Sequence, residues 1–400
     1  MAVDDIDRAP PLGRDRGVSL LYHPTVRAVA FQVLLAVAVI AFVIWIADNT
    51  VANLRRANIA SGFAFLSNRA GFDISQTLVS YSIESTYARA LLVGFLNTLL
   101  VAALGIVLAS IIGFSLGIAR LSGNWLIAKV ATVYIEIVRN VPVLLQLLFW
   151  YRAVLSVLPG PRQGIHLPFG SNLSNRGLLL PRPVIGAGLG ETVVAFLVAI
   201  GLVVGVRIWA RRRQLATGRQ FPVLWVGLAI LIGLPLVVFL VTGEPLSLEF
   251  PELKGFNFVG GVQIKPEFIA LLLGLSLYTA TYIGEIVRAG ILAVAHGQTE
   301  ASYSMGLRPA QTLRLVVIPQ AMRVIIPPLT SQYLNLTKNS SLAVAVGYPD
   351  LVAVFSGTVL NQTGQAVEVI FITMVVYLAI SLATSLVMNW LNQRMTLVER

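Results

Sequence analysis

The tetrapeptide Glu-Ile-Val-Arg occurs twice in the chain, once ending at Arg139 and once at Arg288. In each copy the glutamate and the arginine are three residues apart, so on a helix they share one face and can pair locally or with a neighbouring helix. Charges in or beside apolar segments are costly, so each pair needs a reason. Two interpretations stay open for Glu136, Arg139, Glu285 and Arg288: structural ion pairs that hold helix ends, or charges that belong to a gate.

A second group of residues that can do chemistry lies in a later, otherwise apolar stretch. Ser331, Asn335, Lys338 and Leu342 are spaced four, three and four apart, and Asn339 is adjacent. On a helix this spacing keeps three polar groups on one face. Inside a membrane such a face must meet other helices or a water-filled path. Interhelical hydrogen bonding and a path both stay open here, and on a path the ammonium of Lys338 is available to attract a carboxylate.

The sequence offers no set of residues for catalysis, metal binding or nucleotide binding. There is no cysteine, and the three histidines are far apart (His23, His166 and His296). A phosphate-binding P-loop needs a glycine before its lysine, whereas here the preceding residues are Ala, Leu, Ile and Thr (Lys129, Lys254, Lys265 and Lys338). No HExxH motif is present either. We therefore expect a protein that is not an enzyme and has no metal or cofactor of its own.

The composition places the chain in a membrane. Of its 400 residues 56% are apolar and 12% charged, against about 25% charged in soluble proteins. The net charge of +11 comes with arginines clustered beside apolar segments, as the positive-inside rule describes. A nucleic-acid-binding protein would instead carry a continuous basic face.

The elements that position these residues are predicted to be about eight transmembrane helices, so the expected fold is an all-α polytopic membrane protein. The stretch 28–47 is long enough to span, and no small-residue cleavage site follows it. By the positive-inside rule both termini lie on the cytoplasmic side. The predicted parts are a tail (1–27), a first, extra helix (28–47), an outer loop (48–89), helices in 90–157, an insertion with two extra helices (158–265), helices in 266–392 and a tail (393–400).

A polar loop at 298–320, here called the coupling loop, separates two of the apolar segments. It is predicted to form a short helix, a break and a second helix. Thr299 can cap the first helix, Gly306 suits a left-handed residue that ends it, and Pro309 suits the first turn of the next. A structured loop of this kind presents a face on which a soluble partner can dock.

At these residues the chain resembles a known family, the membrane subunits of bacterial ATP-driven (ABC-type) importers. Their "EAA" loop runs Glu-Ala-Ala, three residues, Gly, nine residues, an apolar residue, one more, another apolar residue and Pro. The matching positions here are Glu300, Ala301, Ser302, Gly306, Val316, Ile318 and Pro319. Ser302 in place of alanine is the one departure.

Three further segments are similar to that family. Residues 139–142 with Gln146 match its Arg-Gly-Thr-Pro-x-x-x-Gln segment except at Asn140 and Val141, and 282–291 resemble the segment before its loop. Residues 338–342 with Asn335 match its Asn and Lys-Asn-Thr/Ser-Ser-Leu pattern. The resemblance implies ATPase coupling through Glu300, Ala301, Ser302, Gly306 and Pro319. It implies a substrate route lined by Asn335, Lys338, Asn339, Ser340 and Gln146.

The resemblance is closest to the polar-amino-acid branch, and the insertion looks like that of the larger general L-amino-acid or glutamate/glutamine/aspartate/asparagine permeases. It implies a five-helix type I importer core with extra helices, in the bacterial inner membrane. The implied partners are an ATPase dimer that binds ATP and magnesium, a second homologous permease subunit, a periplasmic amino-acid-binding protein, the amino acid and the lipid bilayer. No nucleic acid is expected.

An alternative is a secondary transporter or channel driven by an ion gradient. Such proteins often carry carboxylates or broken helices near the membrane midplane. Here the apolar segments lack a central aspartate, and their glutamates lie near segment ends. A membrane enzyme is a weaker alternative because no clustered His or Asp supplies a catalytic set.

Overall fold

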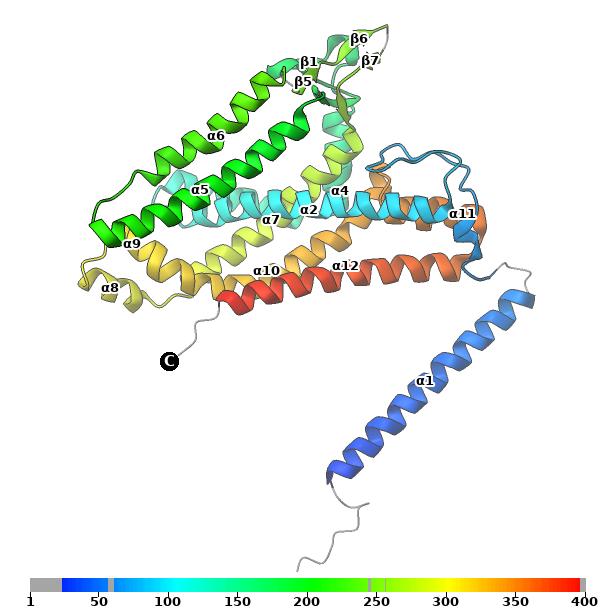
Figure 1. The fold of residues 1–400 in the computed structure, drawn as a ribbon. Coiled ribbons are helices and arrows are strands. Elements are labelled where there is room, and N and C mark those ends of the chain that lie inside the picture. Colours follow the sequence, from blue (N-terminus) through cyan, green and yellow to red (C-terminus); the bar gives the residue numbers. More distant parts are fainter. Residues whose placement is uncertain (1–23, 57–60, 244–245, 256, 396–400) are drawn as a thin grey trace, which may run out of the picture.

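A computed structural model describes residues 24–56, 61–243, 246–255 and 257–395. Within these ranges seven helices are long and apolar enough to cross a membrane, and the count rises to eight if one sharply bent helix pair is a single span. This confirms the predicted polytopic helical fold (Figure 1). The long helices are α1 (Pro24–Arg56), α2 (Tyr87–Arg120), α5 (Leu189–Thr217), α6 (Val223–Val241), α7 (Pro266–Leu292), α10 (Ile318–Asn339) and α12 (Ala366–Met395).

The bent pair consists of α3 (Trp125–Asn140) and the segment that α4 (Val143–Leu148) begins, with an angle of 103° between them. Asn124 caps α3 by accepting from the backbone N–H groups of Leu126 and Ile127. The bend falls at Val141 and Pro142, because the residue before a proline is driven out of the helical region. After α4 the chain continues as the π-helix η3 (Phe149–Leu155).

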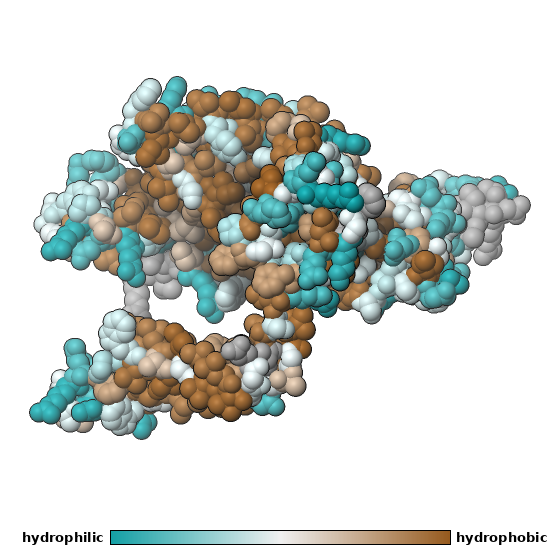
Figure 2. Space-filling model, turned by 90° about the horizontal axis from the view of Figure 1, so that it is seen from above, coloured by the Kyte–Doolittle hydropathy of each residue, from teal (hydrophilic) through white to brown (hydrophobic). Residues whose placement is uncertain are grey.

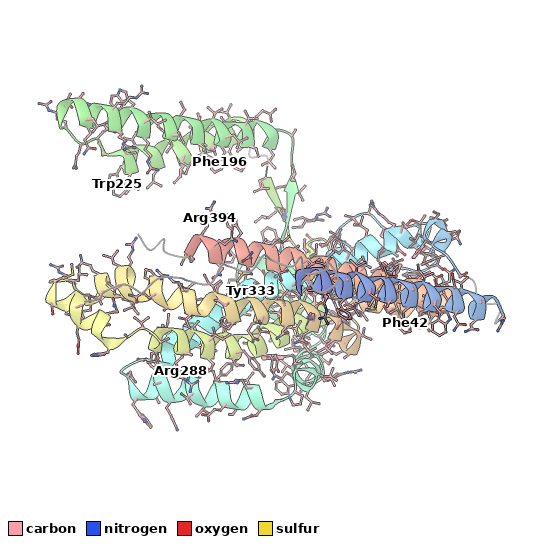
Figure 3. All side chains as sticks on the ribbon, turned by 90° about the horizontal axis from the view of Figure 1, so that it is seen from below. Phe42, Phe196, Trp225, Arg288, Tyr333 and Arg394 are labelled. Carbon is pink, nitrogen blue, oxygen red and sulfur yellow. The ribbon has the colours of Figure 1, made fainter. Side chains whose placement is uncertain are left out.

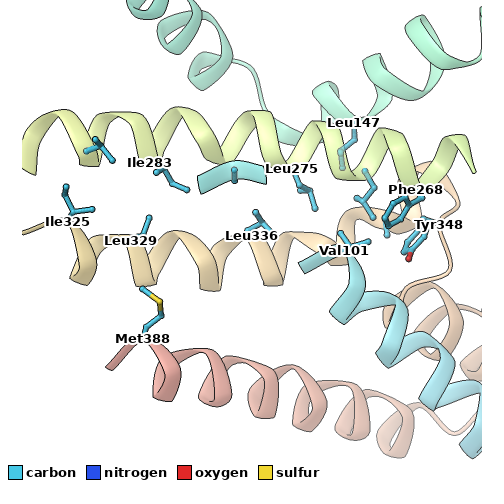
Figure 4. Close-up of a cluster of buried hydrophobic side chains, with 14 of the residues drawn as sticks. Val101, Leu147, Phe268, Leu275, Ile283, Ile325, Leu329, Leu336, Tyr348 and Met388 are labelled. Carbon is cyan, nitrogen blue, oxygen red and sulfur yellow. The ribbon is translucent and has the colours of Figure 1, made fainter. Parts of the chain in front are cut away.

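The core forms where α2, α7 and α10 pack together, with α12 closing one side. Glycines let α2 and α7 approach closely: a Cβ atom at Gly113 would lie 2.6 Å from Ile283 Cβ. Figure 4 shows Leu275 and Ile283 on one helix facing Leu329 and Leu336 on the next. Outward-facing side chains of the helices are apolar, as the brown surface of Figure 2 shows, which is the pattern expected of helices in lipid.

The coupling loop connects α7 to α10. It contains α8 (His296–Ser304), α9 (Pro309–Thr312) and the π-helix η6 (Leu313–Val317). Beyond α10 the chain runs through the 3-10 helix η7 (Ser340–Val346), the π-helix η8 (Val352–Val359) and α11 (Leu360–Thr363) into α12. The segment before α2 holds the 3-10 helix η2 (Ala64–Ser67), which packs on η8 through Phe65 and Phe355.

The insertion contains small sheets that the sequence did not predict. Strands β1 (Ile165–Leu167), β2 (Ser171–Ser174), β3 (Gly177–Leu180) and β8 (Val262–Ile264) form an antiparallel sheet in that order. Two further two-stranded sheets pair β4 (Arg182–Ile185) with β5 (Leu246–Glu249), on either side of α5 and α6, and β6 (Glu252–Lys254) with β7 (Asn257–Val259). Each strand has three or four residues, too few for an alternating pattern to stand out.

The two extra helices of the insertion, α5 and α6, form a hairpin that stands apart from the core in Figures 1 and 3. The helix α5 continues to Thr217 and carries Arg207 and Arg211 to Arg213 on its last turns. Arginine is a good helix former, so a basic flank extends a span rather than ending it.

Of the predicted terminal tails, residues 1–23 and 396–400 lie outside the described residues. The helix predicted at 28–47 begins earlier and runs further, as α1, and Figure 1 shows it apart from the other helices. Its described side chains are almost all exposed. A helix that is apolar and exposed on all sides is suited to lipid.

Candidate functional site

The first helix of the coupling loop begins earlier than predicted. Its N-cap is Ala295, so the expectation that Thr299 caps it is wrong. Thr299 instead lies in the second turn, where its carbonyl oxygen accepts a hydrogen bond of 2.7 Å from Ser302 Oγ. The helix gains its first turn from His296, whose Nδ1 lies 3.0 Å from Glu300 Oε1 one turn later.

The break between α8 and α9 is as predicted. Gly306 has φ +79°, in the left-handed region, and Pro309 is the first residue of α9. The backbone N–H of Arg308 donates to Gln311 Oε1 at 3.0 Å, which closes a capping box at the start of α9. The loop is therefore ordered by its own residues.

Ser302 holds the two helices of the loop together. Its hydroxyl shares a hydrogen bond of 2.9 Å with that of Thr312, and both side chains are buried. The opposite face of the loop points outward with Tyr303 and Met305, and the Met305 side chain is 80% exposed. Glu300 is exposed beside them, and Ala301 also lies on the exposed side. The loop thus presents exposed apolar and acidic groups on an ordered backbone.

The second Glu-Ile-Val-Arg copy forms an ion-pair cluster on α7. Glu285 accepts from Arg288 in its own helix, with Arg288 Nε 3.2 Å from Oε1, and it also pairs with Arg120 at the end of α2. Arg120 was not among the residues that the sequence singled out. Which helix it would meet depends on how α2 and α7 pack, and no local pattern reveals that.

The first copy, on α3, behaves differently from the expected ion pair. Among the described residues neither Glu136 nor Arg139 makes a salt bridge, and both side chains are exposed. Arg139 instead places its guanidinium carbon 4.8 Å from the centre of the Tyr282 ring on α7. This stacking competes with an ion pair between Arg139 and Glu136, because a guanidinium binds well over an aromatic face.

The two copies come together at one pocket of about 310 Å³. It lies between the C-terminal end of α2, the C-terminal end of α3 and the C-terminal half of α7. The residues around it are Arg120, Ile135, Glu136, Arg139, Asn140, Tyr282 and Glu285. The sequence repeat thus identified charged groups that the fold gathers at one place.

The polar residues of α10 fall on two different faces. Ser331, Asn335 and Lys338 are exposed and Asn339 is half-buried, as a route-lining face requires. Ser340 is fully buried and its hydroxyl donates to the Thr337 carbonyl at 2.7 Å. We therefore leave Ser340 out of the exposed set; one residue beyond Asn339 is enough to turn a side chain into the core.

Gln146, which was also expected on the route, stabilises the bend between α3 and α4. Its side-chain Nε2 donates to the carbonyl oxygens of Val138 at 2.8 Å and Val141 at 2.9 Å. These carbonyls lie at the end of α3, where the intrahelical partners are missing. The side chain therefore supplies the hydrogen bonds that the broken helix lacks.

Sequence reasoning missed a buried polar network in the N-terminal third of α2. Asn97 Nδ2 donates to the Pro349 carbonyl at 2.9 Å, and the Leu351 N–H donates to Thr98 Oγ1 at 3.0 Å. Asp350, between two spans, is fully buried and accepts from the Ala353 N–H at 2.8 Å. Burial raises the pKa of Asp350 to about 6. The only sequence signal was the run of polar residues Asn97 and Thr98 inside an apolar span.

Within the described residues no three His, Cys, Asp or Glu side chains gather in a way that could hold a metal ion.

The family described as "Binding-protein-dependent transport system inner membrane component" matches residues 216–397. A general L-amino acid transport system permease protein of Rhizobium johnstonii is 55% identical over 96% of this chain and 95% of its own. A putative amino-acid ABC transporter permease protein of Escherichia coli is 54% identical over 94% of this chain and 96% of its own.

A glutamate/glutamine/aspartate/asparagine transport system permease protein of Rhodobacter capsulatus is 40% identical over 98% of this chain and 99% of its own. Among solved structures, a crystal structure of an amino acid ABC transporter with histidines matches with a TM-score of 0.46 and 20% identity, over 77% of this chain and 95% of that one.

Proposed function

The chain belongs to the family of amino-acid ABC transporter permeases, and from this premise we propose that its coupling loop docks on a separate ATPase subunit. As a permease subunit the chain is not an enzyme, and its family works with an ATPase and a substrate-binding protein. The observation that carries the docking proposal is the coupling loop itself. Met305 and Tyr303 are exposed on a loop that Gly306 and the Ser302–Thr312 bond hold rigid.

Glu300, Ala301 and Ser302 form the acidic and small part of this docking unit, Gly306 gives the turn, and Pro319 begins the helix that carries motion into the membrane. Pro319 is the second residue of α10 and directly follows the π-helix η6, so within this continuous helical stretch it cannot donate an intrahelical hydrogen bond. A push on α8 and α9 reaches α10 through the continuous helical stretch Leu313 to Asn339. The coupling loop therefore connects ATP hydrolysis to the helix that carries the polar face.

The substrate route runs along the exposed face of α10. Lys338 and Asn335 present an exposed ammonium and an exposed amide on a helix of the membrane region. In lipid each polar group without a hydrogen-bond partner costs about 1–3 kcal/mol, so this face needs a partner or water. A second permease subunit, homologous to this chain, covers this face and leaves a polar path between the two. Lys338 attracts the carboxylate of an amino acid, and Asn335 and Asn339 supply amide groups.

The transported substrates are L-amino acids of broad specificity, because the relatives that match over their whole length include a general L-amino acid permease. A periplasmic amino-acid-binding protein delivers them to the outer side. The domain plan is a five-helix core in 90–157 and 266–392, with the insertion 158–265 and the first helix added to it.

The membrane is the bacterial inner membrane, with both termini in the cytoplasm. The arginine-rich end of the α5–α6 hairpin lies at the same end of the molecule as α8 and α9 in Figure 1. Positive charge accumulates on the cytoplasmic side of membrane proteins. The coupling loop consequently faces the cytoplasm, where an ATPase subunit is available.

The test is amino-acid uptake by proteoliposomes that contain the purified complex, with ATP enclosed and binding protein outside. Lys338→Ala is expected to lower uptake at least tenfold with unchanged assembly, whereas Lys254→Ala, on an exposed strand of the insertion, leaves uptake unchanged. Equal uptake by both variants at matched protein level contradicts the role of Lys338. Uptake by the lone chain on an ion gradient without ATP contradicts the importer and favours a secondary transporter.

A further inference from the structure

We infer that the pocket between α2, α3 and α7 is a binding subsite for the charged head of an α-amino acid, with Arg139 holding the carboxylate and Glu136 the ammonium group. The inference rests on the proposed function, since it assigns a second place on the chain where the transported amino acid binds. This subsite differs from the exposed face of α10 in two respects. Its two side chains lie on α3, and they offer a positive and a negative charge side by side.

Two of the charged groups at the pocket, Arg120 and Glu285, already pair with each other. Glu285 also pairs with Arg288, which does not line the pocket, so its carboxylate is fully engaged. These three side chains carry one net positive charge beside the pocket. This surplus favours a ligand with a carboxylate over a purely cationic one.

The two remaining charges have no ionic partner among the described residues. Arg139 lies over the Tyr282 ring and its guanidinium makes no hydrogen bond among the described residues, so its N–H groups are available to an acceptor. The Tyr282 hydroxyl is hydrogen-bonded to that of Tyr278 at 2.9 Å, so the ring that supports Arg139 is itself fixed. Glu136 lies three residues before Arg139 on the same helix. Its carboxylate is exposed at the pocket.

The spacing of these two residues matches a zwitterion. Side chains three apart on a helix have Cβ atoms about 5–6 Å from each other, close enough for one small molecule to contact both. An α-amino acid carries its ammonium and carboxylate on the same carbon. A simple anion would satisfy Arg139 and leave Glu136 unpaired, and a simple cation would do the reverse. A pocket of about 310 Å³ is also at the lower end of ligand-site volumes, as a small molecule requires.

The position of the pocket places the subsite toward the inner half of the route. Figure 3 shows Arg288 on α7 toward the end of the molecule where the coupling loop lies. The helix α7 packs on α10, which carries Lys338 and Asn335. The helix that forms one wall of the pocket therefore also contacts the helix that carries the exposed polar face.

The experiment measures binding to the assembled permease–ATPase complex in nanodiscs without the binding protein. The probes are radiolabelled L-glutamine and two analogues, 4-aminobutanamide, which lacks the carboxylate, and glutaramate, which lacks the amine. Arg139→Gln is expected to weaken glutamine binding at least tenfold and leave 4-aminobutanamide binding unchanged. Glu136→Gln is expected to weaken glutamine equally and leave glutaramate binding unchanged. Arg207→Gln, an exposed arginine of α5, is the control and changes none of the three.

The inference is overturned by glutamine binding that neither variant changes, or by variants that weaken binding of both analogues to the same extent, as a general loss of structure would. A wild-type complex that transports glutamine with ATP but shows no saturable binding without the binding protein also overturns it. That last result leaves the importer function standing. A complex that neither transports nor hydrolyses ATP would instead contradict the proposed function.

Discussion

The hydroxyl groups of Ser302 and Thr312 share a buried hydrogen bond of 2.9 Å that ties α8 to α9. Alanine, which the EAA pattern has at position 302, cannot form it. We predict that Ser302→Ala and Thr312→Val each destabilise the loop by about 1 kcal/mol and that the double variant costs less than their sum. Thermal unfolding of the purified complex checks this, and strictly additive losses would show that the two hydroxyls do not interact.

Gly306 has to be in the left-handed region for α8 to end where it does. A Cβ atom costs about 1–2 kcal/mol in that conformation, although nothing else lies within 4 Å of the position. Gly306→Ala is therefore expected to lower ATP-driven uptake several-fold. Gly306→Asn is the matched control, since asparagine adopts this conformation more readily and restores most of the uptake. Equal activity of the two variants would exclude backbone strain as the reason for the glycine.

Gly117 lets α2 and α7 touch. A Cβ atom there would lie 2.7 Å from the Gly284 carbonyl oxygen and 2.7 Å from Val287 Cβ, which is too close for either. Gly117→Ala is expected to destabilise the complex by about 1–3 kcal/mol. Gly201→Ala on α5, where no atom lies within 4 Å, should leave stability unchanged. The melting temperature of each variant is compared with that of the wild type. An unchanged melting temperature for Gly117→Ala would mean that α2 and α7 can move apart without loss of stability.

Asp350 makes stability depend on pH. Its pKa is raised from 3.8 to about 6 by burial, so the folded protein holds the proton more tightly than the unfolded chain. The free energy of unfolding therefore increases as pH falls from about 6 to about 4, by roughly 3 kcal/mol at most. Asp350→Asn keeps an acceptor for the Ala353 N–H and should remove this dependence. Parallel pH profiles of wild type and variant, measured by thermal unfolding, would refute the assignment.

The sequence predicted the parts of this protein that have a strong local signal. Long apolar segments identify the helices, and Gly306 with Pro309 identifies the break in the coupling loop, because left-handed residues and helix starts have their own residue preferences. The spacing of Asn335 and Lys338 also predicted the exposed face of α10. Each of these depends on neighbours within one or two helical turns.

The failures have a common physical cause, which is that they depend on contacts between distant segments. The roles of Arg120 and Asn97 became visible only when α2 was packed against α7 and the 347–351 turn. Gln146 stays a predicted route residue, and its hydrogen bonds to two carbonyls at the bend could not be read from the sequence. Thr299 was a good capping residue at a position where the helix had already begun, because the helix gains a turn from His296.

The account depends most on the docking of the coupling loop to an ATPase subunit, and the absence of cysteine makes a direct measurement possible. We would attach benzophenone maleimide to Met305→Cys and, as the control, to Phe169→Cys, whose side chain is 89% exposed in the insertion. After illumination of the purified complex, the account predicts a cross-link to the ATPase subunit from position 305 and none from position 169. A complex that hydrolyses ATP, yet cross-links to the ATPase only from position 169 or from neither, would contradict it.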